Sequence, residues 1–153
     1  MVTDGPRPAA KGVPMRKVLS LLAVLVAALG LVVVSEGSAS ALGGESLLCR
    51  VAPAPVTTPF TNPCTPVLAA STYNVGFEVF GGSGTYTYSW SVPVGGGVSV
   101  IAGCGVADAG CTLSVTSHTE HDVTVTVVLT QNGASETLSA QTDIQPVCGQ
   151  VFC

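Results

Sequence analysis

From residue 73 onward the chain alternates apolar and polar residues with a period of two, and this alternation restricts the fold more than any other feature. Residues 73–79 read Y-N-V-G-F-E-V and residues 86–92 read Y-T-Y-S-W-S-V. Residues 123–129 and 138–144 continue the pattern. Short β-branched runs separated by Gly, Pro and Asn turns are typical of antiparallel sandwiches. We therefore predict an all-β domain, a single antiparallel β-sandwich of about seven strands.

The sequence Asn132-Gly133 lies between two of these alternating runs. Asn and Gly tolerate the positive φ angles of a type I′ turn, which joins two strands in a two-residue hairpin. Such a turn fixes the register, and it brings the apolar faces of both strands to the same side. The predicted partners are Gln131 with Ala134, Val127 with Leu138, Val125 with Ala140, and Val123 with Thr142.

A secretory signal is predicted at the N-terminus. Residues 18–34 are uncharged and apolar, follow the basic pair at 16–17, and precede small residues at Ala39 and Ala41. A positive flank, an apolar middle and small residues before the cut define a signal peptide. We predict a helical signal peptide over residues 1–41, with cleavage after Ala41 and secretion of the remainder.

Two alternatives stay open for this segment. Translation could start at Met15, directly before the basic pair, which would give a shorter signal. The apolar block is also just long enough to cross a bilayer, so it could be kept as an anchor. The Ala-Ser-Ala sequence at 39–41 favours cleavage.

The portion after Ala41 is strongly acidic. It holds seven Asp and Glu residues and one basic residue, Arg50, so its net charge is 1 − 7 = −6. Such a surface repels phosphate backbones and anionic lipid headgroups. We therefore expect no nucleic-acid partner and, after cleavage, no membrane partner.

All six cysteines lie after the predicted cut, and their spacings fit no zinc pattern. An even number in an exported chain predicts three disulfides. Cys104 and Cys111 bracket a short loop, and we predict that they pair. The other four leave two arrangements open: Cys49 with Cys64 and Cys148 with Cys153, or bonds that tie the two ends of the domain together.

After Ala41, the prolines are concentrated near the start of the remaining chain. Residues 50–67 contain five prolines, which cannot donate to a central strand ladder. We expect a proline-rich lead-in or edge strand over 42–68, the sandwich over 69–147, and a cysteine-containing tail over 148–153.

Part of the chain resembles bacterial Ig-like and PKD-like domains. Residues 77–92, F-E-V-F-G-G-S-G-T-Y-T-Y-S-W-S-V, resemble the B–C region of that family, where a Gly-rich turn leads into an aromatic strand. Residues 112–133 look like its E–F–G region. The chain departs from the family at 92–95, where an acidic-Gly turn is usual, and at 121–122, where a Tyr often begins strand F. The resemblance implies an Ig-like sandwich that serves binding, spacing or adhesion, not catalysis.

Candidate side chains are few. His118, Glu120, His121 and Asp122 cluster in a predicted turn, and we interpret them as a solvated turn, not a metal site. The same-face spacing of Tyr86, Tyr88 and Trp90 predicts core positions, whereas Phe80 is out of phase and is the candidate surface contact. We expect no catalytic residues, no metal and no cofactor.

Two classes of function follow, with a third kept open. The first is a secreted, non-enzymatic Ig-like module that recognises an extracellular protein or glycan. The second is an extracellular carrier of a small apolar ligand, because secreted actinobacterial chromoprotein apoproteins resemble this chain in size, acidity and sandwich class. The third is a secreted inhibitor that presents the 104–111 loop.

Overall fold

The computed structural model describes residues 42–153, and the predicted signal peptide over 1–41 lies outside these residues. The described portion is all-β, which confirms the predicted fold class. Within it, no helix has the length and hydropathy of a membrane span.

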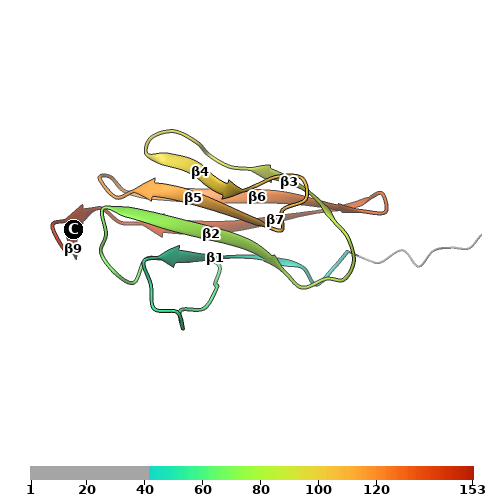
Figure 1. Cartoon of the computed structure of the whole chain (residues 1–153), viewed down its shortest axis with the longest axis horizontal. Helices are drawn as coiled ribbons and strands as arrows, with labels where there is room; N and C mark the ends of the chain where they lie inside the picture. The colour runs from blue at the N-terminus through green and yellow to red at the C-terminus, as the bar shows by residue number, and fades with distance from the viewer. Residues whose placement is uncertain (1–41) are drawn as a thin grey trace, which may run out of the picture. The chain divides into compact units, whose positions relative to one another are not determined.

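Seven strands form two antiparallel sheets that face one another, and two short strands form a C-terminal hairpin (Figure 1). The larger sheet has the order β1-β2-β5-β4, the smaller sheet has the order β3-β6-β7, and β8 pairs with β9. The strands are β1 (Ser46–Ala52), β2 (Thr72–Phe80), β3 (Thr87–Ser91), β4 (Val98–Gly103), β5 (Gly110–Thr116), β6 (His121–Gln131), β7 (Ala134–Ile144), β8 (Val147–Cys148) and β9 (Val151–Phe152).

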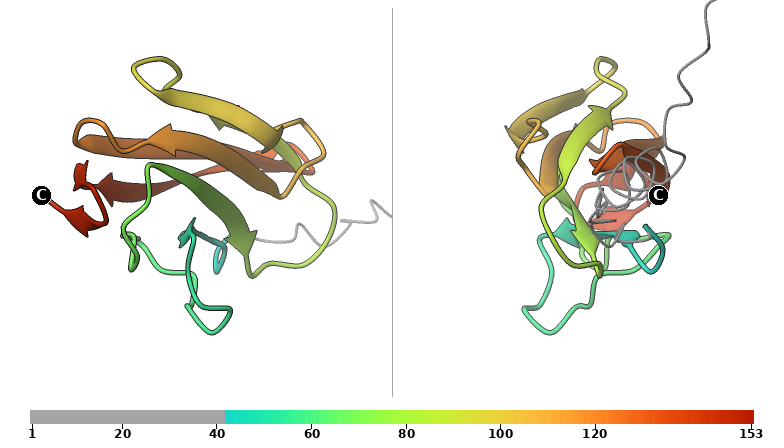
Figure 2. Two further views of the ribbon diagram at one scale, coloured as in Figure 1. Left: turned by 60° about the vertical axis from the view of Figure 1, so that its left-hand side comes forward. Right: turned by 90° about the vertical axis from the view of Figure 1, so that its right-hand side faces the viewer.

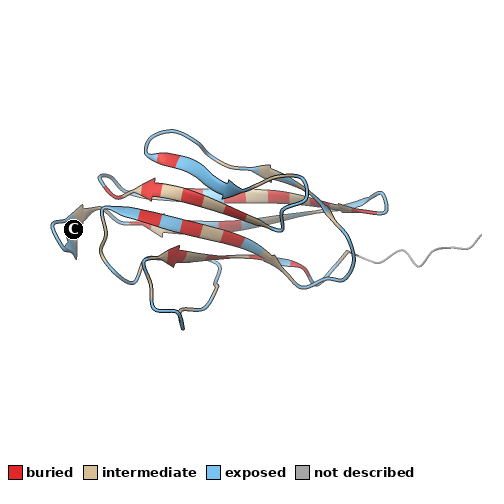
Figure 3. Cartoon of the chain, viewed as in Figure 1, coloured by how far each residue is buried: buried red, intermediate tan, exposed pale blue. Residues whose placement is uncertain are grey.

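The core lies between the two sheets and is filled by the apolar phase of each strand. Every second residue is buried in β5, in β2 as far as Phe77 and in β6 from Val123 on, as the alternating red bands of Figure 3 show. Burial of these side chains supplies the main driving force for folding, at roughly 25 cal/mol per Å² of apolar surface. The largest fully buried apolar side chains are Tyr73, Phe77, Leu113, Leu129 and Ile144.

The β6–β7 hairpin has the predicted register. Asn132 and Gly133 have φ angles of 51° and 83°, as a type I′ turn requires. Gln131 pairs with Ala134, and Val127 pairs with Leu138. The same register places Val125 opposite Ala140 and Val123 opposite Thr142.

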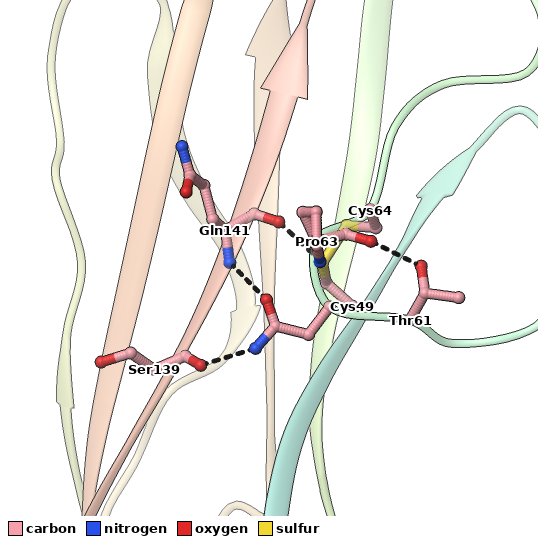
Figure 4. The surroundings of a disulfide bond; sticks show 7 residues. Cys49, Thr61, Pro63, Cys64, Ser139 and Gln141 are labelled. Atoms are coloured by element: carbon pink, nitrogen blue, oxygen red, sulfur yellow. Dashed lines mark hydrogen bonds between the residues drawn. A yellow bond between two sulfur atoms is a disulfide. The ribbon is translucent and has the colours of Figure 1, made fainter.

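The proline-rich segment contributes an edge strand and then closes one side of the sandwich. β1 pairs with β2, so the larger sheet begins at Ser46, well before the predicted start of the sandwich at 69. The segment then crosses to the smaller sheet, where Asn62 and Cys64 bond to β7 (Figure 4). Asn62 donates to the Ser139 carbonyl at 2.8 Å and accepts from the Gln141 amide at 3.2 Å.

The prediction that Tyr86, Tyr88 and Trp90 fill the interior overstates the burial of these side chains. Tyr88 and Trp90 lie opposite buried Leu129 and Val127, so they share the inner face, but all three aromatic side chains are only half-buried. The reason is position: β3 is an edge strand, and no strand lies beyond it. Tyr88 and Trp90 stack with their ring centroids 6.5 Å apart.

Candidate functional site

Three of the four sheet edges are covered by loop backbone. The outer edge of β1 bonds to Thr61, whose amide and carbonyl both pair with Cys49 at 2.8–2.9 Å. The edge of β7 bonds to Cys64, and the edge of β3 receives one bond, from the Tyr88 amide to the Val106 carbonyl at 2.9 Å. Covered edges prevent unwanted strand pairing.

The fourth edge, on β4, is covered only at its first residue, where Val98 and Gly95 exchange two backbone bonds at 2.9–3.0 Å; from Ser99 on it has no such cover in the described part of the chain. β4 runs along the rim of the larger sheet, and apart from its first residue it is exposed throughout (Figures 2 and 3). Its pairing with β5 is interrupted by a bulge at Ile101. The bulge and the short Gly95–Val98 bridge protect this edge, and β4 itself carries neither charge nor proline.

An uncharged, partly apolar surface surrounds this edge. No Asp, Glu, Lys, Arg or His occurs between Glu78 and Asp108, although residues 42–153 have a net charge of −6. Four large apolar side chains are exposed within this uncharged stretch, two on β4 and one in each flanking loop: Val94 at 70%, Val100 at 42%, Ile101 at 51% and Val106 at 74%. We call the exposed β4 strand with these four side chains the β4 surface. Exposed apolar patches of this kind mark interaction sites.

The 104–111 loop supports the β4 surface. A disulfide joins Cys104 to Cys111, the pair singled out from the sequence. The loop then folds onto the neighbouring sheet, where the Asp108 carbonyl accepts from Trp90 Nε1 at 3.0 Å. Its carbonyls at Val106 and Asp108 are therefore engaged within the domain, while the Val106 side chain faces solvent.

The remaining cysteines pair locally. Cys49 bonds to Cys64 and Cys148 bonds to Cys153, which selects the first of the two arrangements that the sequence left open. The Cys49–Cys64 bond links β1 of the larger sheet to the segment that pairs with β7 (Figure 4). Three disulfides favour an oxidising, extracellular environment.

A second surface feature is a hollow of about 280 Å³ on the outside of the larger sheet, lined by Arg50, Phe60 and Glu78 among others. The Arg50 guanidinium lies over the Phe60 ring, 5.0 Å from its centroid. Phe80, predicted to be an exposed contact, is half-buried because it packs edge-on against Phe60 at 5.2 Å. Arg50 and Phe60 thus form a cation–π pair beside the hollow.

The polar turn before β6 does not assemble a site. His118 and Glu120 are exposed, and His121 begins β6 with Nε2 3.2 Å from the Thr119 hydroxyl. Among residues 42–153 no group of three or more His, Cys, Asp or Glu is placed to hold a metal ion. The turn therefore lacks the converging side chains that acid–base or metal chemistry requires.

The sequence pattern gave no indication of the β4 surface. Val98 and Val100 alternate as in a half-buried strand, but only Val98 is buried. The signal that could have identified this surface is the 29-residue uncharged stretch over 79–107 in an otherwise acidic domain. An uncovered edge and an uncharged apolar rim are suited to holding a partner chain. Comparison of the chain with protein-family models, with curated proteins and with solved structures gave no match.

Proposed function

We propose that this protein is a secreted, non-enzymatic, Ig-like recognition module that binds an extracellular protein through the β4 surface. The partner adds a strand along β4, so that its backbone pairs with the free edge and its apolar side chains contact Val100 and Ile101. This mode of recognition takes its affinity from main-chain hydrogen bonds and its specificity from the side chains that flank them.

The observation that carries the proposal is the uncovered β4 edge. The uncovered part begins after Val98, which bonds to Gly95. From Ser99 on, β4 has no loop-backbone partner among residues 42–153, whereas the other three sheet edges bond to loop backbone. An uncharged apolar edge in a domain of net charge −6 favours a protein partner over a phosphate-bearing or anionic one.

The alternatives have less support. A carrier of apolar ligands needs a concave pocket of roughly 300–1,000 Å³. The hollow beside Arg50 and Phe60 measures about 280 Å³, and a second hollow, beside Thr65 and Asp143, measures about 230 Å³. An inhibitor needs a loop that projects toward a protease. The 104–111 loop instead turns its carbonyls toward β3 and Trp90.

The test compares a charged variant of the edge with a matched control. Ile101→Lys places a cation on the exposed bulge of β4, and Thr124→Lys places the same cation on the exposed outer face of β6. Each protein is used to capture partners from extracellular medium and cell-wall fractions. We expect wild type and Thr124→Lys to retain one protein partner and Ile101→Lys to lose at least tenfold in affinity, about 1.4 kcal/mol.

Amide hydrogen exchange then locates the contact. On binding, the amides of 98–103 should exchange more slowly, while those on the outer face of β6 should not change. A partner that is retained equally by both variants, or one that protects a different strand, would refute the β4 surface as the binding site. Capture of a polysaccharide in place of a protein would refute the proposed class of partner.

A further inference from the structure

A cluster of oxygen atoms lies between the two sheets at the end where β1 begins. The Tyr86 hydroxyl donates to Glu45 Oε1 at 2.7 Å, and the Gly43 amide donates to Glu45 Oε2 at 2.7 Å. The Glu136 side chain is also a neighbour of Glu45 and makes a small contribution to lowering the Glu45 pKa. Glu45 is only 8% exposed, so this negative charge is held in a poorly hydrated position.

Gln131 brings a further oxygen to the same cluster. Its Nε2 donates at 3.0 Å to the Ser83 carbonyl, which lies 3.3 Å from the Tyr86 hydroxyl. Gln131 is 6% exposed, and its Oε1 atom is buried with no hydrogen-bond partner among residues 42–153. Glu136 Oε2 is buried without a partner as well. A buried acceptor left unpaired costs about 1–3 kcal/mol.

Both unpaired acceptor atoms belong to inward-facing residues of the β6–β7 hairpin. Glu136 lies opposite buried Leu129, and Gln131 is the next inward residue along β6. The loop before β3 packs closely over the cluster, because a side chain at Gly82 would collide with the Tyr86 hydroxyl and the Glu45 carboxylate. The cluster is therefore closely packed and rich in acceptors, and it is open to solvent on the side of Gly82 and Ser83.

We propose that Glu45, Glu136 and the Gln131 side-chain oxygen bind a calcium ion between the two sheets. The Ser83 carbonyl and the Tyr86 hydroxyl lie beside the cluster and complete an all-oxygen environment. Two carboxylates balance the charge of the ion, and the ion satisfies both orphaned oxygens. This inference is independent of the β4 surface and of its partner.

The donor set selects calcium over other metals. Carboxylate, amide and carbonyl oxygens suit hard cations, whereas zinc and copper favour imidazole and thiolate. Magnesium demands a near-ideal octahedron, whereas calcium accepts the irregular geometry of oxygen atoms from four separate segments. With only two charged ligands, the expected dissociation constant is in the range of extracellular calcium modules, on the order of 10⁻⁴–10⁻³ M.

The test measures calcium binding and stability together. The chelator-treated protein is titrated with calcium by calorimetry, and thermal unfolding is followed with and without calcium at constant ionic strength. At calcium about ten times the dissociation constant, linkage should raise the folded-to-unfolded ratio on the order of tenfold. Glu136→Gln should weaken binding by about tenfold or more. The matched control Glu78→Gln, on the exposed outer face of β2, should bind as wild type does.

Three results would overturn the site. Wild type could show no calcium-dependent change in thermal unfolding, which would mean that the cluster binds no calcium. Magnesium could reproduce the whole effect, which would indicate general charge screening. Glu78→Gln could lose as much affinity as Glu136→Gln, which would place the ion elsewhere.

Discussion

The bond between Tyr86 and Glu45 joins the start of β1 to the start of β3, and it makes the stability of the domain depend on pH. Donation from the Tyr86 hydroxyl, and then from the Gly43 amide, lowers the pKa of Glu45 below its ordinary value. A carboxyl group with a lowered pKa in the folded state adds stability above its unfolded pKa, and this stability is lost as the pH falls through the folded pKa. The same bond raises the pKa of Tyr86, so its contribution is also lost when alkaline pH ionises the phenol.

Tyr86→Phe should therefore be less stable than wild type at neutral pH, and the difference should shrink as acid protonates Glu45. Urea unfolding in the presence of chelator, from neutral pH to below the ordinary Glu pKa, measures this effect without interference from calcium. Tyr88→Phe is the matched control, because Tyr88 lies on the same aromatic row. If the difference in unfolding free energy between Tyr86→Phe and wild type stayed constant across this pH range, the Tyr86–Glu45 bond would not be the cause of the pH dependence.

At the scale of strands and hairpins, the sequence predicted whatever depends on local pattern and turn chemistry. It predicted the β6–β7 register because Asn132-Gly133 and the alternation of the valines demand the same pairing. It could not predict that β3 is an edge strand, because alternation reveals the face of a strand and not its place in a sheet. Tyr86 and Trp90 are half-buried for that reason. The polar cluster did leave a signal: Gln131 is a polar residue in phase with the buried valines.

Substitution of the turn residue Gly133 tests how strongly the hairpin depends on the backbone conformation of its turn. Its φ angle is +83°, where an L side chain is strained, so Gly133→Ala should destabilise the domain by about 1–2 kcal/mol. Gly76 is the matched control, because it lies within β2, has no positive φ angle, and a Cβ there would meet no atom within 4 Å. Gly76→Ala should cause no loss, since glycine in a strand carries an entropic cost that alanine reduces. Equal losses in denaturant unfolding would mean that the turn does not hold the register.

At the scale of the whole described domain, two cystine-bearing segments close the two sides of the sandwich. On one side, the Cys49–Cys64 segment covers the edges of β1 and β7. On the other side, the Cys104–Cys111 loop bonds to β3 and leaves β4 open. The third disulfide, Cys148–Cys153, closes the small β8–β9 hairpin. Covalent closure thus protects three edges, and the fourth edge stays free to bind a partner under our proposal.

This arrangement predicts unequal roles for the disulfides. By loop entropy, the bond that closes 15 residues is worth about 3 kcal/mol and the bond that closes 5 residues about 2 kcal/mol. Cys49 and Cys64 are also buried, so Cys49→Ala with Cys64→Ala leaves unfilled space as well. We expect that pair to cost about 3–5 kcal/mol in guanidinium unfolding, and Cys148→Ala with Cys153→Ala to cost about 2 kcal/mol or less.

Hydrogen exchange distinguishes this edge role from a simple loss of stability. The Gln141 and Asp143 amides donate to Asn62 and Cys64, so they depend on the segment that the Cys49–Cys64 bond holds in place. In the Cys49/Cys64 double variant these two amides should exchange much faster, whereas the Val125 amide in the centre of the smaller sheet should follow global unfolding only. If the exchange of all three amides became faster by the same factor, the Cys49–Cys64 disulfide would stabilise the domain only by restricting the unfolded chain. Faster exchange at Gln141 and Asp143 alone would instead show that the disulfide keeps the β7 edge covered.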